Sequence, residues 1–310
     1  MSRSTRVRHG NHVTDARTCQ HVRMARRRRT ALGGDGVERG GLDAVADILG
    51  SADPAVLSGA GISTESGIPD YRGPASARRD VRPITYQEFV RDAAARRRYW
   101  ARSFAGWPFM DAREPNDGHR AVAALEAAGL VVGVVTQNVD GLHQRAGSRN
   151  VVELHGSLAR VRCLSCGAVE ARAVLQERLA ALNPGFVAVA PRYAPDGDAD
   201  VPHELVAAFR VAPCFVCGGV LKPLVVFFGE NVPKETYEAA RDMVSGAGAL
   251  VVVGSSLTVR SGYRFVLQAK AAGKPVAIVN DGPTRADAEA DVKVEGRLGE
   301  LLPALAARVL

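Results

Sequence analysis

Four of the five cysteines form two pairs with the spacing of metal-binding knuckles. A glycine follows each pair, and 47 residues separate the pairs. Two such knuckles can direct four thiolates at one tetrahedral ion. A disulfide framework and a redox C-x-x-C are the alternatives, but two pairs flanking one segment favour zinc. A four-sulfur site leaves no position for water, so we expect one structural Zn²⁺ held by Cys163, Cys166, Cys214 and Cys217.

A glycine-rich turn follows the first apolar run, 54–57, and reads Ser58-Gly59-Ala60-Gly61-Ile62. Glycines at the end of a strand let the backbone approach a diphosphate, and the amide groups that follow can donate to it. Thr64, however, stands where the dinucleotide fingerprint has its third glycine. No acidic residue about 20 residues later supplies a ribose ligand. The turn therefore indicates phosphate binding but not an ordinary dehydrogenase.

Polar side chains follow two more apolar runs. Gln137, Asn138 and Asp140 come after the run 130–135, and His155 comes directly after the run 151–154. An open α/β sheet places its ligand crevice at the carboxyl ends of such strands. Histidine is the usual base at neutral pH, so His155 is a candidate, although a lone histidine is more often structural. We expect the other candidate histidine, at position 119, to be structural, with nothing reactive around it.

Alternating helical and β-branched stretches must position these residues. Amphipathic or helical spacing predicts helices over 42–49, 85–104, 119–128, 171–182, 234–244, 262–272 and 298–309. Apolar runs predict strands over 54–57, 130–135, 151–154, 225–228, 249–253 and 275–279. Continuous apolar strands alternating with helices are typical of a parallel sheet covered on both faces. The predicted fold class is α/β, with a doubly wound, parallel, Rossmann-like sheet.

This rhythm is lost between about residues 158 and 221, the segment that holds the four paired cysteines. We predict a Rossmann-like domain over 41–157 and 222–310, with a helical insertion at about 73–115 and a small zinc-binding module at 158–221. Residues 1–40 have no apolar periodicity and are predicted to be a disordered basic tail.

The formal net charge of +7 lies in that tail. Residues 1–40 hold ten arginines against three acidic residues, whereas positive and negative charges balance over 41–310. The balanced charge of residues 41–310 therefore argues against nucleic-acid binding, except through the tail. No apolar run reaches the roughly 18–20 residues of a membrane helix, and the tail lacks the apolar region of a secretory signal. We expect a cytoplasmic protein in a bacterium, or a mitochondrial one in a eukaryote.

Seven motifs in one order resemble those of the sirtuins. They are GAGIS with GIPDYR, TQNVD, ELHG, the paired C-x-x-C knuckles, KPLVVFFGE, VVVGSSL and IVN. The resemblance covers about residues 41–302. PDYR, YWARSFAGW, LQERLAALNP and APDGD resemble class II, on the branch with lipoamidase and ADP-ribosylating activities. It implies an NAD-dependent enzyme that removes acyl groups from protein lysines, so acylated proteins or peptides are the implied partners.

The resemblance also implies roles for individual residues. The cofactor loop would comprise Gly59, Ala60, Gly61, Ile62, Asp70, Tyr71 and Arg72. The nicotinamide end would be held by Gln137, Asn138 and Asp140. The phosphates and the adenosine ribose would be held by Gly254, Ser255, Ser256 and Asn280. A peptide would join, as an added strand, the edge formed by Val226, Phe228 and Gly229.

The implied chemistry begins with departure of neutral nicotinamide from C1′ of NAD. The acyl oxygen of the substrate lysine attacks C1′, and His155 then accepts a proton from a ribose hydroxyl. Asn138 and Asp140 would assist, and the products would be free lysine, nicotinamide and O-acyl-ADP-ribose. Mono-ADP-ribosyl transfer in the same pocket is the nearest alternative. A zinc-containing nucleic-acid-binding module is a remote one.

Overall fold

The computed structural model describes residues 34–71, 83–186 and 192–310, and for residues 34–39 it describes the backbone only. The predicted cofactor residue Arg72 and most of the predicted tail lie outside these ranges. The first helix, α1 (Gly34–Ser51), begins before residue 40, the end of the predicted tail.

Six parallel strands form the main sheet, which confirms the predicted fold class. They are β1 (Ala55–Ser58), β2 (Gly133–Thr136), β3 (Val151–Glu153), β7 (Leu250–Val253), β8 (Val276–Asn280) and β9 (Val292–Glu295). Their order is β3-β2-β1-β7-β8-β9, with every neighbouring pair parallel. Strand β9 was not predicted from the sequence, because this edge strand has only four residues and contains no continuous apolar run.

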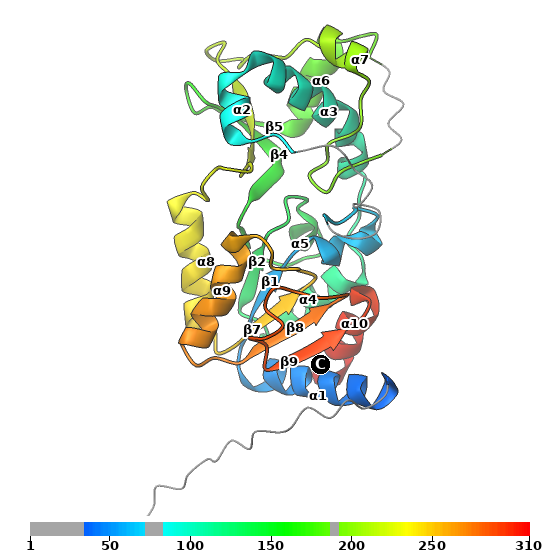
Figure 1. Cartoon of the computed structure of the whole chain (residues 1–310), viewed down its shortest axis with the longest axis vertical. Coiled ribbons are helices and arrows are strands. Elements are labelled where there is room, and N and C mark those ends of the chain that lie inside the picture. Colours follow the sequence, from blue (N-terminus) through cyan, green and yellow to red (C-terminus); the bar gives the residue numbers. More distant parts are fainter. Residues whose placement is uncertain (1–33, 72–82, 187–191) are drawn as a thin grey trace, which may run out of the picture. The chain divides into compact units, whose positions relative to one another are not determined.

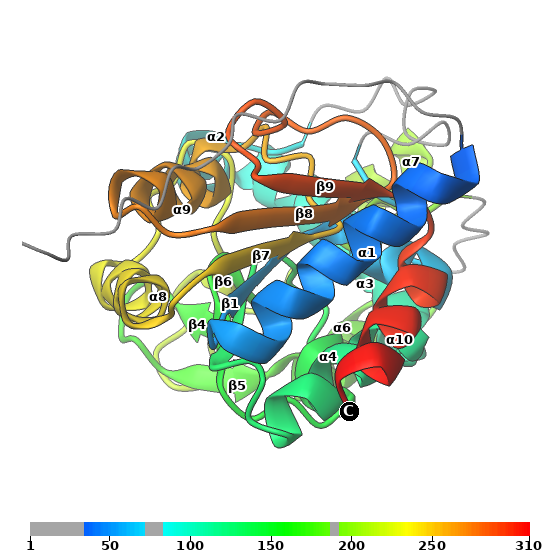
Figure 2. The same cartoon turned by 90° about the horizontal axis from the view of Figure 1, so that it is seen from below.

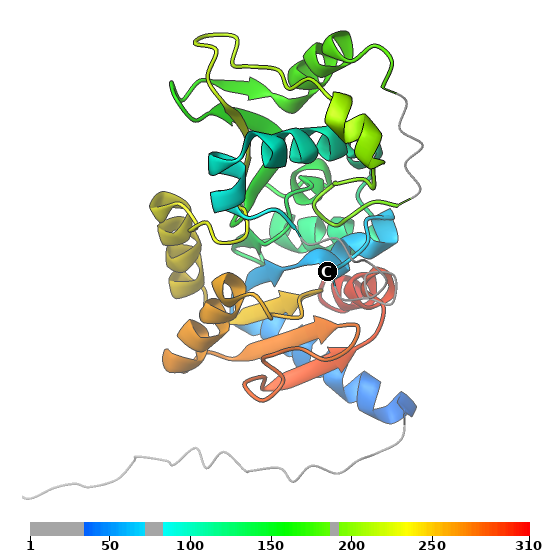
Figure 3. The ribbon, with the colours of Figure 1, turned by 45° about the horizontal axis from the view of Figure 1, so that its top comes forward.

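Helices cover both faces of this sheet (Figure 2). Helices α1, α4 (Asp117–Ala127) and α10 (Leu298–Val309) pack on one face, in a core that includes Val56 of β1. Helices α8 (Lys234–Gly246) and α9 (Arg260–Ala271) lie side by side on the other face, over Leu57 (Figure 3). Successive residues of a strand thus point to opposite faces of the sheet and pack in different cores. None of the helices in the described ranges is long and apolar enough to cross a membrane.

A second, antiparallel sheet lies in the part that holds the cysteines (Figure 1). Its strands are β4 (Gly156–Cys163), β5 (Val169–Ala171) and β6 (Leu221–Val225), in the order β5-β4-β6. The prediction that 225–228 forms a strand among those of the parallel sheet is therefore wrong. The strand begins four residues earlier and pairs with β4. Lys222 and Pro223 interrupt the apolar pattern at its start, so the apolar run alone pointed only to 225–228.

Four helices pack with this sheet around one aromatic core. They are α2 (Tyr86–Arg91), α3 (Ala93–Asp111), α6 (Arg172–Leu182) and α7 (His203–Ala208). Phe89 and Trp100 share this core with Leu175, Leu179 and Phe227. The rings of Phe89 and Phe227 meet edge to face with centroids 5.2 Å apart. The segments predicted as a helical insertion and as a zinc-binding module thus share a core, and the exact domain boundaries stay a prediction.

Candidate active site and metal centre

A cleft of about 1090 Å³ opens where β1 and β7 end. The chain continues from β1 toward β2 on one side and from β7 toward β8 on the other, which is where ligands bind in open α/β sheets. The cleft is lined by most of the predicted site: Gly59, Ala60, Gly61, Asp70, Tyr71, Gln137, Asn138, Asp140, His155, Val226, Phe228, Gly229, Gly254, Ser255, Ser256 and Asn280. Ile62 is the exception among the described candidates, because its side chain is 1% exposed and lies in the main core.

Gly59 and Gly61 allow the turn after β1 to touch the turn after β7. The amide of Gly61 donates to the carbonyl of Gly254 at 2.8 Å. A Cβ at Gly61 would lie 2.8 Å from that carbonyl oxygen, and one at Gly59 would lie 2.7 Å from Cβ of Ser255. Both distances are shorter than real Cβ contacts. These glycines are therefore needed for the contact between the two turns, in addition to any approach to a phosphate.

Asp140 is held at the base of the cleft by groups from two elements. Ser63, in the 3-10 helix η1 (Ala60–Ser66), donates to Oδ2 at 2.8 Å, and the amide of Leu142 donates to Oδ1 at 2.9 Å. The carboxamide of Asn138 donates to Oγ of Ser63 at 3.1 Å. Burial raises the pKa of Asp140, and the two donors oppose that rise. The arrangement fixes a carboxylate and a carboxamide side by side.

Two buried histidines lie behind this network. His119 is 0% exposed, which fits the expected structural role, and its Nε2 lies 3.5 Å from Oγ of Ser63. Nε2 of His143, in α5 (Leu142–Arg145), is 2.8 Å from Oγ of Ser58, and the two imidazole rings meet edge to face. Burial lowers the pKa of His119 to about 3 and that of His143 to about 4. Both rings are therefore neutral at pH 7.

His155 follows β3 and lies with both ring nitrogens bonded. Nδ1 is 2.8 Å from the carbonyl oxygen of Gln137, and Nε2 is 2.7 Å from Oγ of Ser261. Burial lowers the pKa of His155, and the bond to the Gln137 carbonyl opposes this effect. The imidazole is therefore neutral near pH 7, as a general base must be.

The predicted peptide-binding segment follows β6 directly. The amide of Val226 donates to the carbonyl of His155 at 2.8 Å, which ties this segment to the candidate base. Phe228 is 49% exposed and forms a parallel bridge with Thr85. The carbonyl of Gly229 accepts from Nε2 of Gln87 at 3.0 Å. All three predicted edge residues thus have partners within the chain, and addition of a peptide strand there stays a prediction.

The four paired cysteines converge as a zinc site requires. Their sulfur atoms all lie within 4.8 Å of one another, with Cys163 and Cys217 3.5 Å apart and Cys166 and Cys214 3.8 Å apart. A Zn–S bond of about 2.3 Å places the sulfurs of a tetrahedron about 3.8 Å apart. Amides of Ser165 and Val216 donate to the first sulfur of each knuckle at 3.4 Å. The donor set and its spacing fit one structural Zn²⁺.

The electrostatics of the sulfurs also call for a cation. Amide groups of Cys166 and Ser165 lower the pKa of Cys163 to about 6. Although the Gly219 amide acts in the same lowering direction at Cys217, the neighbouring sulfurs outweigh it and raise the pKa of that thiol to about 12. Four thiolates therefore coexist here only when a cation compensates their repulsion.

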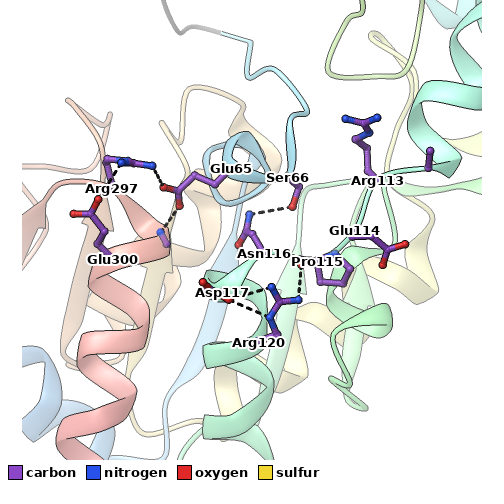
Figure 4. Close-up of a pocket in the computed structure, with 12 residues that line it drawn as sticks. Glu65, Ser66, Arg113, Glu114, Pro115, Asn116, Asp117, Arg120, Arg297 and Glu300 are labelled. Atoms are coloured by element: carbon purple, nitrogen blue, oxygen red, sulfur yellow. Dashed lines mark hydrogen bonds and ion pairs between the residues drawn. The ribbon is translucent and has the colours of Figure 1, made fainter.

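A second depression, of about 580 Å³, lies beside η1 and the first turns of α4 and α10 (Figure 4). Glu65 crosses it, because its carboxylate accepts from the amide of Gly299 and pairs with Arg297 at 2.7 Å. Asn116 caps α4 and donates to the carbonyl of Ile62 at 2.7 Å. These contacts attach the cofactor turn to two helices. The spacing of the sequence motifs predicted none of them.

Comparison with known proteins identifies the same residues as a family core. The family model described as Sir2 family matches residues 59–261. The chain is 58% identical over 265 residues to NAD-dependent protein deacetylase 1 of Streptomyces coelicolor, covering 86% of this chain and 89% of the relative. It is 52% identical over 251 residues to the mitochondrial NAD-dependent protein lipoamidase sirtuin-4 of Homo sapiens, with 80% of each chain covered.

A solved structure of a Sir2 protein with a p53 peptide and NAD⁺ superposes with a TM-score of 0.68 at 30% identity. The match covers 86% of this chain and 98% of the other. The expected resemblance is therefore confirmed in both sequence and fold. With a family model over residues 59–261 and relatives matched over most of both lengths, this chain belongs to the Sir2 family, the sirtuins.

Proposed function

We propose that the chain is an NAD-dependent protein lysine deacylase that releases nicotinamide, free lysine and O-acyl-ADP-ribose. Membership of the Sir2 family, with relatives named as NAD-dependent deacetylases and a lipoamidase, supports this reaction. Acylated lysines of proteins or peptides are the substrates, in line with the peptide and NAD⁺ present in the similar solved structure. The zinc ion is structural and takes no part in the reaction.

One observation carries the assignment at the level of residues. The cleft between β1 and β7 is lined by a neutral imidazole, a buried carboxylate and a carboxamide, and Ser63 joins the carboxylate to the carboxamide. Asp140 and Asn138 would bind the nicotinamide end, since both line the cleft and Asn138 donates to the carbonyl of Gly59 in the glycine-rich turn at 3.1 Å. His155 would accept the proton of a ribose hydroxyl, because its environment keeps the ring uncharged.

The adenosine end would occupy the other part of the cleft. Gly254, Ser255 and Ser256 follow β7, and Asn280 ends β8, so their polar groups lie at the carboxyl edge of the sheet. An extended cofactor that reaches both groups spans the switch point of the sheet, as in other open α/β folds. These contacts remain our proposal.

The variant His155→Ala tests the proposed base. We expect NAD binding to persist and deacylation to fall by about 10²–10⁴-fold, since that is what a general base contributes. NAD binding is measured by calorimetric titration, and free lysine is measured by mass spectrometry of an acylated peptide. Deacylation at the wild-type rate in this variant would remove His155 from the mechanism.

Mono-ADP-ribosyl transfer is the second candidate reaction, because it uses the same cleft and the same leaving group. Mass spectrometry of products formed from NAD and a panel of acetyl, longer acyl, lipoyl and succinyl peptides separates the two. Free lysine with O-acyl-ADP-ribose supports deacylation and ranks the acyl groups. An ADP-ribosyl adduct on protein, with no free lysine from any peptide, would contradict it. The compartment stays a prediction.

A further inference from the structure

The hydroxyl group of Ser261 contacts the ring nitrogen of His155 that would accept the ribose proton in the proposed reaction. Its Oγ is 2.7 Å from Nε2 of His155. Ser261 is the second residue of α9 and lines the same cleft as the base. No sequence motif had assigned a role to this residue.

The hydrogen-bond pattern fixes the direction of this contact. Nδ1 of His155 is 2.8 Å from the carbonyl oxygen of Gln137, and a carbonyl can only accept, so Nδ1 carries the proton. In the neutral ring Nε2 then has a free electron pair, and the hydroxyl of Ser261 donates to it. The pair that must accept a ribose proton is thus occupied by Ser261 in this structure.

The start of α9 also shapes the residue on the other side of the ring. A Cβ at Gly262 would lie 2.5 Å from Nε2 of Gln137, so the Gln137 carboxamide packs directly on the helix backbone. Ser255 donates to Oε1 of the same carboxamide at 2.7 Å. Adjacent residues of one helical turn therefore contact both the base and the residue whose carbonyl holds the base. The imidazole is clamped from both of its nitrogens.

Resting on the deacylase function proposed above, we propose that Ser261 is a positioning residue for the base. It holds His155 in the tautomer protonated at Nδ1 and gives up Nε2 to a ribose hydroxyl when NAD is bound. In that step the ribose O–H bond breaks and an Nε2–H bond forms. The electron pair remains on the attacking ribose oxygen, and Ser261 keeps its own proton.

Two activities of the full chain separate positioning of the base from structural damage. Release of free lysine needs the base, whereas exchange of labelled nicotinamide into NAD needs only cleavage and re-formation of the bond between nicotinamide and ribose. We compare Ser261→Ala with Ser261→Thr, which keeps a hydroxyl. Ser51→Ala, at an exposed serine near the end of α1, is the matched control.

For Ser261→Ala at pH 7 we expect kcat/KM of deacylation to fall about three- to ten-fold, with exchange unchanged within about two-fold. Ser261→Thr should retain at least about half of the activity, and Ser51→Ala should match wild type.

An unchanged ratio of deacylation to exchange in Ser261→Ala, whether both activities persist or both fall together, would overturn the positioning role. A wild-type chain that exchanges nicotinamide but releases no free lysine from any acyl peptide would instead overturn the proposed function. Nitrogen NMR shifts of the wild-type His155 ring provide a check without mutation, since a ring protonated at Nε2 contradicts the proposed tautomer.

Discussion

Side chains that are far apart in the sequence hold the candidate carboxylate and carboxamide. The predicted base, carboxylate and carboxamide all line one cleft. Ser63 bonds to Asp140 and Asn138 and lies 3.5 Å from His119, and His143 bonds to Ser58, all between residues 56–85 positions apart. Contacts over such separations leave no periodicity or spacing in a single sequence. Their only signal was a cluster of small polar residues directly after strands.

The neutral state of His143 predicts how stability depends on pH. Its pKa is about 4 in the fold, against about 6.5 in an unfolded chain, so the unfolded state binds the extra proton between these values. The contribution is complete above pH 6.5 and is lost as pH falls toward 4, at about 1.4 kcal/mol per pH unit. Urea unfolding at several pH values measures this slope.

The variant His143→Gln should reduce that slope by about 1.4 kcal/mol per pH unit between pH 6 and 4.5. The matched control is His203→Gln, because His203 is exposed at the start of α7 and makes no contribution by burial. A slope that responds equally to both substitutions would contradict the assignment to His143.

At the scale of elements, the buried apolar strands and the amphipathic helices were predicted well from the sequence, whereas the edge strand β9 and the pairing of β6 were not. The runs that became β7 and β8 are four and five fully buried residues, so their composition marks them. Strand β9 is half-buried, and β6 joins another sheet, because pairing partners rather than local propensity decide where such strands go. No pattern in the sequence indicated the attachment of η1 to α10 either.

That attachment predicts the effect of Glu65→Ala. The carboxylate accepts from the amide of Gly299 in the first turn of α10, so its loss removes a helix cap and should lower the free energy of unfolding by about 1 kcal/mol. The cofactor turn η1, which bonds to Asp140 through Ser63, loses its link to α10, and KM for NAD should rise more than kcat falls. Unfolding in urea and steady-state kinetics measure the two effects.

Glu300→Gln is the control for this variant, since Glu300 is exposed and only pairs with Arg297 at 3.0 Å (Figure 4). It should change the unfolding free energy by less than about 0.5 kcal/mol. If Glu65→Ala left KM for NAD at the wild-type value, the link between α10 and the cofactor turn would have no functional role.

At the scale of the whole molecule, the helical segment and the zinc-binding segment, which were predicted as two separate insertions, share one hydrophobic core. Phe89 and Trp100 come from the helical segment, whereas Leu175 comes from the segment between the cysteine pairs. The sequence signalled each segment by its own composition but carried no sign that they share an interior. Their common core includes Cys163 and Cys214 and continues through Phe227 into the predicted peptide segment, so the cysteine cluster and that segment share one core.

Loss of the metal should therefore also reduce deacylation. We expect Cys217→Ser to abolish zinc binding, to lower Tm by about 5 °C or more and to abolish deacylation. Elemental analysis, thermal melting and peptide mass spectrometry measure these changes. Cys19→Ser is the control, because Cys19 belongs to neither C-x-x-C pair, and the zinc content of this variant should stay at one ion per chain. Full deacylation by metal-free Cys217→Ser would contradict the connection.

The strand order has a consequence for how the chain is made. Strand β1 is central, between β2 and β7, and Ala55 pairs with Leu250, 195 residues later. At about 5–20 residues per second, a ribosome needs about 10–40 s to supply that partner. During this interval the β7 side of β1, where Ala55, Val56 and Leu57 are apolar, has no neighbour, while residues up to the end of β6 emerge. The antiparallel sheet and the cysteine cluster can therefore form on the nascent chain before the parallel sheet closes.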